Sequence, residues 1–587
     1  MNAIPSLLTG QLGIWITAET EKKSGRGRSG SNGVNVYGIR KLRELILELA
    51  VRGKLVPQDP DDEPAGELLK HIQVEKAKLV AVGKIKKDKP LPPITDEEKP
   101  FELPQGWEWV RLGEITNFGI TEKLDFIPDE TWVLDLEDIE KDTSRLLQKY
   151  KFSERNSLSA KNSFQTGDVL YGKLRPYLNK VIVADEAGVC TTEILPFRCF
   201  GPFSSNYFKF ALRSPYFISY VNARSYGMKM PRLGTEDGRK AYFPLPSLAE
   251  QHRIVTKVDE LMALCDQLET QHINAAEAHE KLVNHLLGTL TRSQNADDFS
   301  TSWQRIAAHF DTLFTTEASI DILKQTLLQL AVMGKLVPQN PDDEPASELL
   351  KRIQAEKDKL IAEGKIKKNK PLPPISDEEK PFELPQGWEW IKLNELVEKN
   401  DAGWSPTCED HPRHGNDWGV LKVSAVSWGK FLPDENKALP KSLDARLNCV
   451  VETGDFLISR ANTAELVARS VVVEDCPPNL MLSDKIVRLR LSLFCNSQFI
   501  NIANSSLFSR NYYSRIAGGT SSSMKNVSRE QILGLIIPLP PLAEQHRIVT
   551  KIDELMALCG QIQSRITQSD QLQQKLADAV VERAIAS

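Results

Sequence analysis

The sequence predicts an α+β protein in which two compact mixed domains alternate with two long helices. Three observations support this prediction: the chain is too long for one domain, much of it occurs twice, and each copy ends in a long heptad-patterned segment. With 587 residues the chain exceeds the usual size of a single domain. Its hydrophobic content of 41% and charged content of 26% are those of an ordinary folded protein.

Two stretches of the sequence recur almost unchanged. Residues 49–110 reappear shifted by 281 positions, so that Trp107 corresponds to Trp388. The segment LAEQHRIVTKVDELMALC at 248–265 recurs at 542–559 with one substitution, shifted by 294 positions. The order is therefore arm, variable stretch and long helix, followed by the same three parts again.

Between the repeats lie two variable stretches, 104–246 and 385–540, which resemble each other only faintly. A framework that is copied closely while its inserts diverge is expected if the framework docks on a two-fold partner and each insert recognises something different. The alternative is a recent tandem duplication without functional meaning.

The repeats divide the chain into eight segments. They are a flexible leader (1–37), a helical arm with a proline-rich linker (38–103), a first variable domain (104–246), a first long helix (247–292), a connector (293–318), a second arm and linker (319–384), a second variable domain (385–540) and a second long helix (541–587).

Local patterns justify the leader, the arms and the domains in turn. Residues 19–33, ETEKKSGRGRSGSNG, are polar and rich in glycine and serine, so we expect them to be flexible. The arms begin with helical patterns at 41–55 and 322–336, and proline-broken segments such as KPLPPITDEEKP predict extended linkers lying over other surfaces. In the variable domains the β-branched runs DVLYG, KVIVAD, FLISR, SVVVED and KIVRLRL predict strands.

The long helices are predicted from a four-three spacing of apolar or small residues, which is typical of a coiled-coil seam. The first seam is Ile254, Val258, Leu261, Cys265, Leu268, His272, Ala275, His279, Leu282 and Leu286, and the second is Ile548, Ile552, Leu555, Cys559, Ile562, Ile566, Ser569, Gln573, Leu576 and Val580. A helix of about 40 residues is about 60 Å long, which suits a spacer. His272 and His279 lack further ligand residues around them, so simple packing or a polar pair that sets the helix register is favoured over a metal site.

Charge and cysteine content restrict the class of protein. The formal net charge of −5 does not exclude a DNA binder, because phosphates are recognised by local basic clusters. The eight cysteines form no C-x-x-C pair and follow no framework spacing, which fits a cytoplasmic protein. We identify no export signal and no run of the roughly 18 apolar residues that a membrane span needs.

Each variable domain carries two turn segments suited to DNA contact, because their basic and amide side chains can hold phosphates or reach base edges. In the first domain the candidate residues are Lys173, Arg175, Tyr177, Asn179, Lys180, Arg224, Tyr226, Lys229 and Arg232. In the second they are Arg460, Asn462, Thr463, Gly519, Thr520, Ser521, Ser522, Lys525 and Asn526. Each cluster alone could be a solvated turn, but the corresponding placement in both domains favours function.

The sequence is poor in catalytic motifs. It has no Walker-type nucleotide loop and no Asn-Pro-Pro-Tyr-like tetrapeptide of an amino-methyltransferase. Asp59, Asp61 and Asp62 lie in a polar linker rather than beside a strand, which disfavours a nuclease site. Cys408, His411 and His414 have ligand-type spacing but no fourth partner and no counterpart in the first domain. We therefore expect no catalytic residue and no metal on this chain.

After about residue 38 these motifs resemble those of type I restriction-modification specificity subunits, most closely the subgroup with long spacers. The Pro-x-Gly-Trp-x-Trp segments resemble the start of a target recognition domain, and PLPSLAEQHRIVTKVDEL with its copy resembles the exit into the long helix. LYGKLRPYLNKV at 170–181 and GVCTTEILPFR at 188–198 resemble inner strands. Two segments depart from the pattern: 460–463 replaces the Lys-Leu-Arg-Pro core, and 224–232 differs from the Gly/Ser/Thr-rich loop at 518–526.

The resemblance implies two target recognition domains separated by two long antiparallel helices, with an internal pseudo-two-fold repeat. Each domain would recognise one half of a bipartite, asymmetric site in double-stranded DNA, and helix length would set the gap. Two modification subunits would supply S-adenosylmethionine and adenine methylation, and two restriction subunits would supply translocation and cleavage with ATP and Mg. This chain would carry no cofactor. The alternative is a non-enzymatic scaffold whose variable domains bind proteins.

Overall fold

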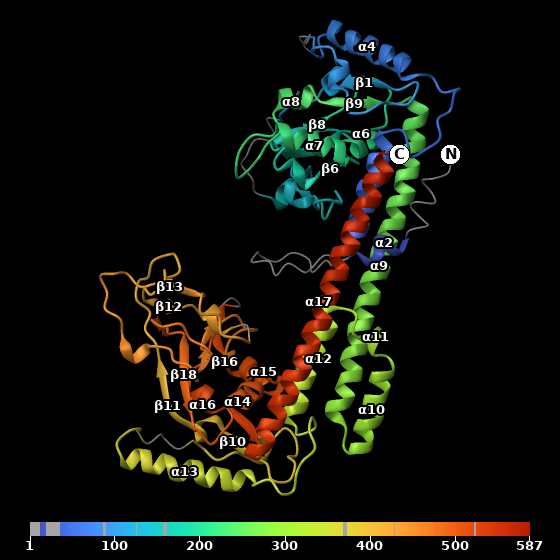
Figure 1. The fold of residues 1–587 in the computed structure, drawn as a ribbon. Helices are drawn as coiled ribbons and strands as arrows, with labels where there is room; N and C mark the ends of the chain where they lie inside the picture. Colours follow the sequence, from blue (N-terminus) through green and yellow to red (C-terminus); the bar gives the residue numbers. More distant parts are fainter. Residues whose placement is uncertain are drawn as a thin grey trace. The chain divides into compact units, whose positions relative to one another are not determined.

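The structure is a computed structural model that describes residues 12–18, 36–85, 90–124, 126–155, 161–367, 372–427, 429–521 and 524–586. It divides into two compact units (Figure 1). Unit 1 comprises Met1–Ala276 and Gln568–Ser587, and unit 2 comprises Glu277–Thr567. Each unit therefore holds one arm, one variable domain and a part of both long helices.

Unit 1 begins with helices of the leader and arm and continues into the first variable domain. Its elements are α2 (Leu12–Thr17), α3 (Tyr37–Val51), α4 (Ala65–Ala81), β1 (Glu108–Arg111), α5 (Leu112–Ile115), β2 (Trp132–Leu134), β3 (Tyr150–Lys151), β4 (Lys161–Phe164), β5 (Val169–Gly172), β6 (Val181–Val183), β7 (Gly188–Thr191), β8 (Ile194–Phe197), α6 (Ser205–Leu212), α7 (Pro215–Arg224), α8 (Thr235–Arg239), β9 (Tyr242–Leu245) and the start of α9 (Leu248–Arg292).

Unit 2 repeats this order after the connector. Its elements are α10 (Ala296–Ala308), α11 (Phe310–Leu313), α12 (Glu317–Val332), α13 (Ala346–Ala362), β10 (Glu389–Lys392), β11 (Val397–Ala402), β12 (Gly419–Leu421), β13 (Asn436–Ala438), β14 (Phe456–Ser459), β15 (Ala461–Asn462), β16 (Ser470–Val472), β17 (Leu480–Met481), β18 (Ile486–Leu491), α14 (Ser497–Ser505), α15 (Leu507–Ile516), β19 (Gly518–Ser521), β20 (Met524–Asn526), α16 (Arg529–Leu533), β21 (Ile536–Leu539) and most of α17 (Leu542–Ala586).

The two variable domains share a core sheet topology. The order β3-β2-β7 in unit 1 corresponds to β13-β12-β17 in unit 2, and β6-β5-β8 corresponds to β16-β14-β18. Each domain contains one parallel pair, β2 with β7 and β12 with β17, among otherwise antiparallel strands. Strands β4, β11 and the sheet β15-β20-β19 are additions to this common core. The strands predicted from the β-branched runs are present as β5, β6, β14, β16 and β18.

The first and last strands of each domain pair with one another. β1 pairs antiparallel with β9, placing Glu108 opposite Leu245, and β10 pairs in the same way with β21, placing Glu389 opposite Leu539. The repeated tryptophan motif and the repeated proline-leucine motif are thus adjacent strands in space. The divergent sequence is an insert between two ends that the framework holds together.

A buried carboxylate ties these ends to the long helix in unit 1. Glu250, in the first turn of α9, is 3% exposed and accepts hydrogen bonds from Trp107 Nε1 (2.8 Å) and Gln58 Nε2 (2.7 Å). One turn later Arg253 pairs with Asp62 at 2.6 Å. Burial raises the pKa of Glu250. The two repeated sequence blocks meet at this carboxylate.

Unit 2 contains the same joint. Glu544, 1% exposed, accepts hydrogen bonds from Trp388 Nε1 and Gln339 Nε2, both at 3.0 Å. Arg547 pairs with Asp343 at 2.7 Å, and burial also raises the pKa of Glu544. Every partner in this joint is related to its counterpart by the 281 or the 294 shift.

The arm helix fixes the direction of both long helices in unit 1. Arg43 of α3 bonds Glu269 of α9 (2.9 Å), whereas Gln58, past the end of α3, bonds Glu250, so α3 and α9 run antiparallel. Tyr37 donates to Asp578 of α17 at 2.7 Å, and the last turns of α17 also lie along α3. The segments of α9 and α17 in unit 1 therefore run antiparallel, as the fold class requires.

Each arm is completed by the last turn of the other copy's long helix. Lys54 Nζ donates to the carbonyl of Ile585 at the end of α17 (3.1 Å). Its counterpart Lys335 donates to the carbonyls of Thr291 and Ser293 at the end of α9 (3.1 and 2.8 Å). A lysine is favourable there because the last carbonyls of a helix lack partners within the helix.

The buried face of the long helices departs from the predicted seam in its second half. Cys265 is buried as predicted, but farther along Val283 is buried and Leu282 is 49% exposed. In α17 Ala577 is likewise buried and Leu576 is 49% exposed. The predictions that Leu282 and Leu576 lie on the buried face are wrong. The buried positions are 18 residues apart (265 and 283, 559 and 577), which equals five turns of a straight helix with 3.6 residues per turn. The predicted seam assumed a repeat of 3.5 residues, which places the buried residue one position too early.

The leader and the linkers also differ from expectation. The prediction of a flexible leader over 1–37 is wrong for 12–18, where α2 buries Trp15 and Ala18 against α3; residues 19–33 lie outside the described residues. The helices α4 and α13 interrupt the segments expected to be linkers, since three apolar residues at helical spacing suffice to bury one face. Among the described residues no helix is both long and apolar enough to cross a bilayer.

Replacing Trp107 with Phe removes the indole N–H but keeps a ring in the pocket. We expect local stability to fall by about 1–3 kcal/mol, because the buried Glu250 loses a hydrogen-bond donor. Hydrogen exchange should quicken in β1, β9 and the start of α9, and the matched variant Trp388→Phe should instead affect β10 and β21. Unchanged exchange in both variants would contradict a structural role for this joint.

The Glu250→Gln variant should become more stable relative to wild type as pH rises from 4 to 7. Burial raises the folded-state pKa of Glu250, so its contribution is greatest below the unfolded pKa, about 4.3, and is lost as pH rises through the folded pKa. A glutamine at this position carries no charge, so the variant does not lose this contribution to stability as pH rises. Thermal unfolding across pH tests the difference, with the exposed Glu260→Gln as control; parallel pH profiles for Glu250→Gln and wild type would refute it.

Candidate nucleic-acid interface

In each variable domain the two polar segments singled out from the sequence lie next to each other. In unit 1 the turn after β5 bonds to a later hairpin, since Arg175 N donates to Pro231 O (2.7 Å) and Leu233 N to Lys173 O (3.0 Å). In unit 2 β15, after β14, pairs with β20 of the later hairpin. We call the first surface face 1 (173–180 and 224–232) and the second face 2 (460–463 and 518–526).

Face 1 presents basic side chains that the protein itself does not neutralise. Arg175, Arg224 and Lys229 are exposed, and none of them forms an ion pair with any described residue. The Arg224 guanidinium lies 5.0 Å from the centre of the Tyr220 ring. Lys173 is partly exposed beside them. These cations remain available to an anionic ligand such as a phosphate backbone.

Other predicted residues of face 1 are engaged within the domain. Lys180 Nζ donates to Leu136 O (2.6 Å), and burial lowers its pKa. Asn179 Nδ2 donates to Arg213 O at 3.3 Å. The Arg232 guanidinium binds both carboxylate oxygens of Glu193 at 3.0–3.2 Å, and this hydrogen bonding raises the Arg232 pKa. These three side chains therefore stabilise the structure of face 1 through contacts within the domain.

Face 2 is less basic and rich in small polar residues. Arg460 is partly exposed, and Thr463 and Asn526 are exposed. Asn462 Nδ2 donates to Ser427 Oγ (2.9 Å), and Lys525 Nζ donates to Gly519 O (2.8 Å). The side chains of Thr520 and Ser521, and all of Ser522, lie outside the described residues.

A glycine is required in the hairpin of face 2. Gly519 has φ +128°, and a Cβ there would lie 2.5 Å from Met524 O. Only a residue without a side chain allows the two hairpin strands to approach so closely.

The structure adds residues that sequence reasoning missed. Glu193 anchors face 1 through Arg232, and Ser427 holds Asn462 in face 2. Face 1 also exposes apolar side chains: Met228 is fully exposed and Met230 is 45% exposed. The signal for the methionines was the Met-Lys-Met run directly after Gly227, but no pattern marks Glu193 or Ser427, which act through contacts distant in sequence.

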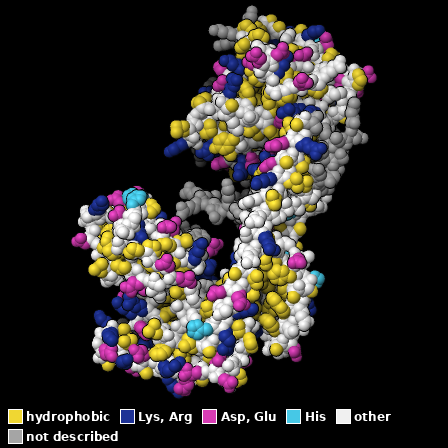
Figure 2. All heavy atoms as spheres, viewed as in Figure 1, with side chains coloured by type: hydrophobic (Ala, Val, Ile, Leu, Met, Phe, Trp, Pro, Cys, Tyr) yellow, Lys and Arg dark blue, Asp and Glu magenta, His cyan; other side chains and the backbone are white. Residues whose placement is uncertain are grey.

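Acidic and basic side chains are interspersed over both units on the side of the molecule seen in Figure 2. This distribution agrees with the small net charge of −5. Affinity for an anionic polymer must then come from local groups such as the free cations of face 1, rather than from an overall field.

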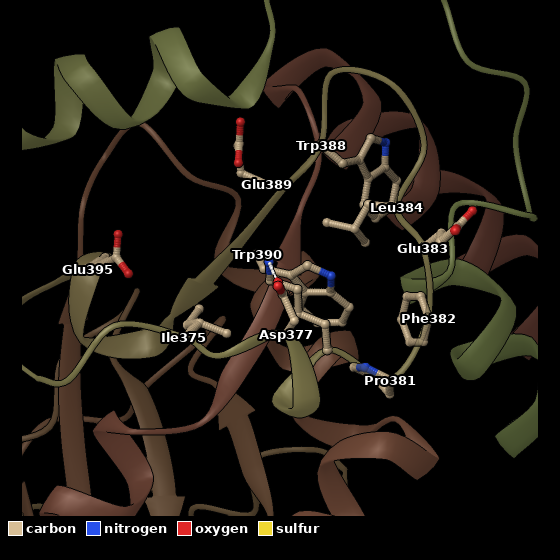
Figure 3. A pocket seen from close by; sticks show the side chains of 11 residues that line it. Ile375, Asp377, Pro381, Phe382, Glu383, Leu384, Trp388, Glu389, Trp390 and Glu395 are labelled. Carbon is tan, nitrogen blue, oxygen red and sulfur yellow. Dashed lines mark hydrogen bonds and ion pairs between the residues drawn. The ribbon is translucent and has the colours of Figure 1, made fainter.

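A groove beside the second linker is a different kind of surface. Phe382, Leu384, Trp388 and Trp390 line it together with carboxylates, including Glu389 and Glu395 (Figure 3). Apart from Glu395 its lining residues belong to the repeated framework, so the groove gives no basis for binding a different ligand in each copy. Four acidic residues against Lys380 also disfavour a phosphate ligand there.

The Cys408, His411 and His414 cluster has an internal structural explanation. The two imidazole rings stack with centroids 5.1 Å apart, and His411 Nδ1 lies 2.8 Å from Pro412 O. Among the described residues no group of three or more His, Cys, Asp or Glu is arranged to hold a metal ion.

Comparison with known proteins identifies the family. The model of the type I restriction modification DNA specificity domain matches residues 104–278 and 385–569, which are the two variable domains with the first part of each long helix. The chain belongs to the type I restriction-modification specificity subunits.

Relatives of this specificity subunit align over nearly its whole length. The EcoEI specificity subunit of Escherichia coli is 44% identical and the EcoAI specificity subunit of Escherichia coli is 41% identical, each over 99% of this chain and 100% of the relative. A chain from a solved structure on assembly and conformational transition of the type I R-M system is 19% identical, covers 83% of this chain and 99% of its own length, and has a TM-score of 0.47.

The free and engaged cations of this specificity subunit should differ in DNA binding. Replacing Arg175 or Lys229 with Ala should weaken binding to any duplex and reduce the slope of log affinity against log salt by about one for each phosphate interaction removed. Lys180→Met is the matched control in the same segment, because its ammonium already binds a carbonyl. Fluorescence anisotropy over a KCl series measures the slopes; an effect of Lys180→Met equal to that of Arg175→Ala would contradict the assignment.

Proposed function

We propose that this specificity subunit recognises a bipartite, asymmetric site in double-stranded DNA, with face 1 contacting one half and face 2 the other. The observation that carries the proposal is that the two faces occupy the same place in one core topology but differ in their residues. The framework joint at the start of the long helix is the same in both copies. Two inserts with one core fold and different contact residues suit two different half-sites.

The contacts divide by chemistry. In face 1 we assign phosphate contacts to Arg175, Arg224 and Lys229, and base or sugar contacts to Tyr177 and Tyr226, which are 46% and 62% exposed. In face 2 Arg460, Thr463 and Asn526 are the exposed or partly exposed candidates. The backbone amides of Gly518–Ser521 are candidates for contact with phosphate.

The partner subunits would supply the chemistry. In this proposal two modification subunits dock on the repeated framework and carry S-adenosylmethionine, and two restriction subunits carry ATP and Mg. This chain then binds no cofactor, performs no catalysis and acts in the cytoplasm. The lengths of α9 and α17, 45 residues each, set the unread gap between the half-sites.

Methylation mapping tests the proposal directly. DNA from cells that express this chain with its modification subunit should carry adenine methylation in a split motif, and either protein alone should leave none. Exchanging residues 104–246 for those of a relative should change one half of the motif, and exchanging 385–540 should change the other. The isolated chain with S-adenosylmethionine should methylate nothing.

Two results would overturn it. If the subunits are expressed and associate but no motif appears, the chain is a scaffold rather than a recognition subunit. If either exchange alters both halves together, the half-sites are not assigned to separate domains.

A further inference from the structure

The hairpin of face 1 has a fixed base. Tyr226 and Arg232 exchange both backbone hydrogen bonds, at 3.1 and 2.9 Å. The Arg232 side chain is held by Glu193, and Arg175 N bonds the neighbouring Pro231 carbonyl. Gly227, with φ +103°, makes the turn away from Tyr226, and a Cβ there would lie 3.1 Å from Met230 O. The base is thus tied to the turn after β5 and, through Arg232, to the charged side chain of Glu193.

The tip of this hairpin is apolar where a surface turn is usually polar. Met228 is fully exposed and Met230 is 45% exposed, with Lys229 between them. Scattered apolar residues on a surface need no explanation, but here two methionines and Tyr226 fall within five residues, next to Arg224 and Lys229, which form no ion pair with any residue that the structure describes. The sequence at the corresponding position of face 2, 518–523, consists of glycine, threonine and serine, and the following Met524 is 45% exposed.

We propose that Met228 recognises the C5-methyl group of a thymine in the half-site contacted by face 1. This inference rests on the proposed function and specifies how that face discriminates bases. The methyl group of thymine is the one apolar group on the base edges that face the major groove, and an exposed apolar side chain can pack against it. The methionine side chain is unbranched and polarizable, so it adapts to a methyl without a preformed pocket.

The flexibility of the methionine side chain favours this contact over insertion between base pairs as a wedge. A wedge must offset an unstacking cost of a few kcal/mol per step, and the three rotatable bonds of methionine make a soft wedge. Arg175 and Lys229 can hold the flanking phosphates while the tip enters a groove. Insertion of Met228 between base pairs is a separate outcome of the test described below.

The test uses the complex of the full chain with its modification subunit and the site defined by methylation mapping. Met228→Ala should weaken binding to that site about three- to tenfold, as expected when one buried methyl group is no longer covered, and should leave binding to unrelated DNA unchanged. Replacing each thymine of the half-site with deoxyuridine in turn should reveal one position where the same weakening occurs in wild type. At that position the Met228→Ala variant should show no further weakening. Leu493→Ala, at a side chain that is 94% exposed and lies outside both faces, is the control and should leave binding to the site unchanged.

Each contrary outcome is specific. The proposal would be overturned if the half-site contained no A–T pair. It would also be overturned if, at every position, the weakening of binding by Met228→Ala and the weakening by deoxyuridine were additive. A rise in 2-aminopurine fluorescence on binding that disappears in Met228→Ala would overturn it in favour of a wedge. If the wild-type complex recognises no split site, the proposed function itself fails; if it does and Met228→Ala has no effect, only this inference fails. Because Met228 is fully exposed, its replacement leaves the fold intact.

Discussion

The buried carboxylate at the start of each long helix is the interaction on which the rest of the structure depends. Glu250 and Glu544 each accept a hydrogen bond from the tryptophan that opens a variable domain and another from the arm. A buried charge is tolerated only where hydrogen bonds satisfy it, so neither partner can change alone. This constraint accounts for the identity of the joint residues in the two copies, and it does not act on the sequence between the ends of each variable domain.

The recognition faces follow from that division. Their backbones are aligned by equivalent strand pairings, whereas their side chains differ in charge, size and exposure. Some polar side chains serve the domain itself, as those of Lys180 and Arg232 do, whereas the side chains of Arg175 and Lys229 form no ion pair or hydrogen bond with any described residue. In the proposed function, the side chains that folding leaves without partners would supply the contacts to DNA.

Sequence patterns predicted the repeat, both long helices and the inner strands, because near-identity, heptad spacing and β-branched runs are local signals. They also located both polar segments of each face, but their adjacency depends on pairings such as Leu174 with Arg232, which join residues distant in the chain. The engagement of Lys180, the role of Glu193 and the docking of Trp15 depend on tertiary contacts in the same way. The predicted coiled-coil seam is wrong at Leu282 because a short heptad pattern does not reveal the actual number of residues per helical turn.

The exchange of helix ends between the copies bears on how the chain folds during synthesis. Unit 2 is one continuous stretch, Glu277–Thr567, whereas unit 1 needs residues 568–586, which leave the ribosome after every other described residue. Until then the arm helix α3 lacks the packing of Ala577 and Ala584, and Lys54 lacks the carbonyl of Ile585. The half of the protein that is translated first is therefore finished last, and a ribosome that stalls within α17 would leave its apolar surface open to chaperones and proteases.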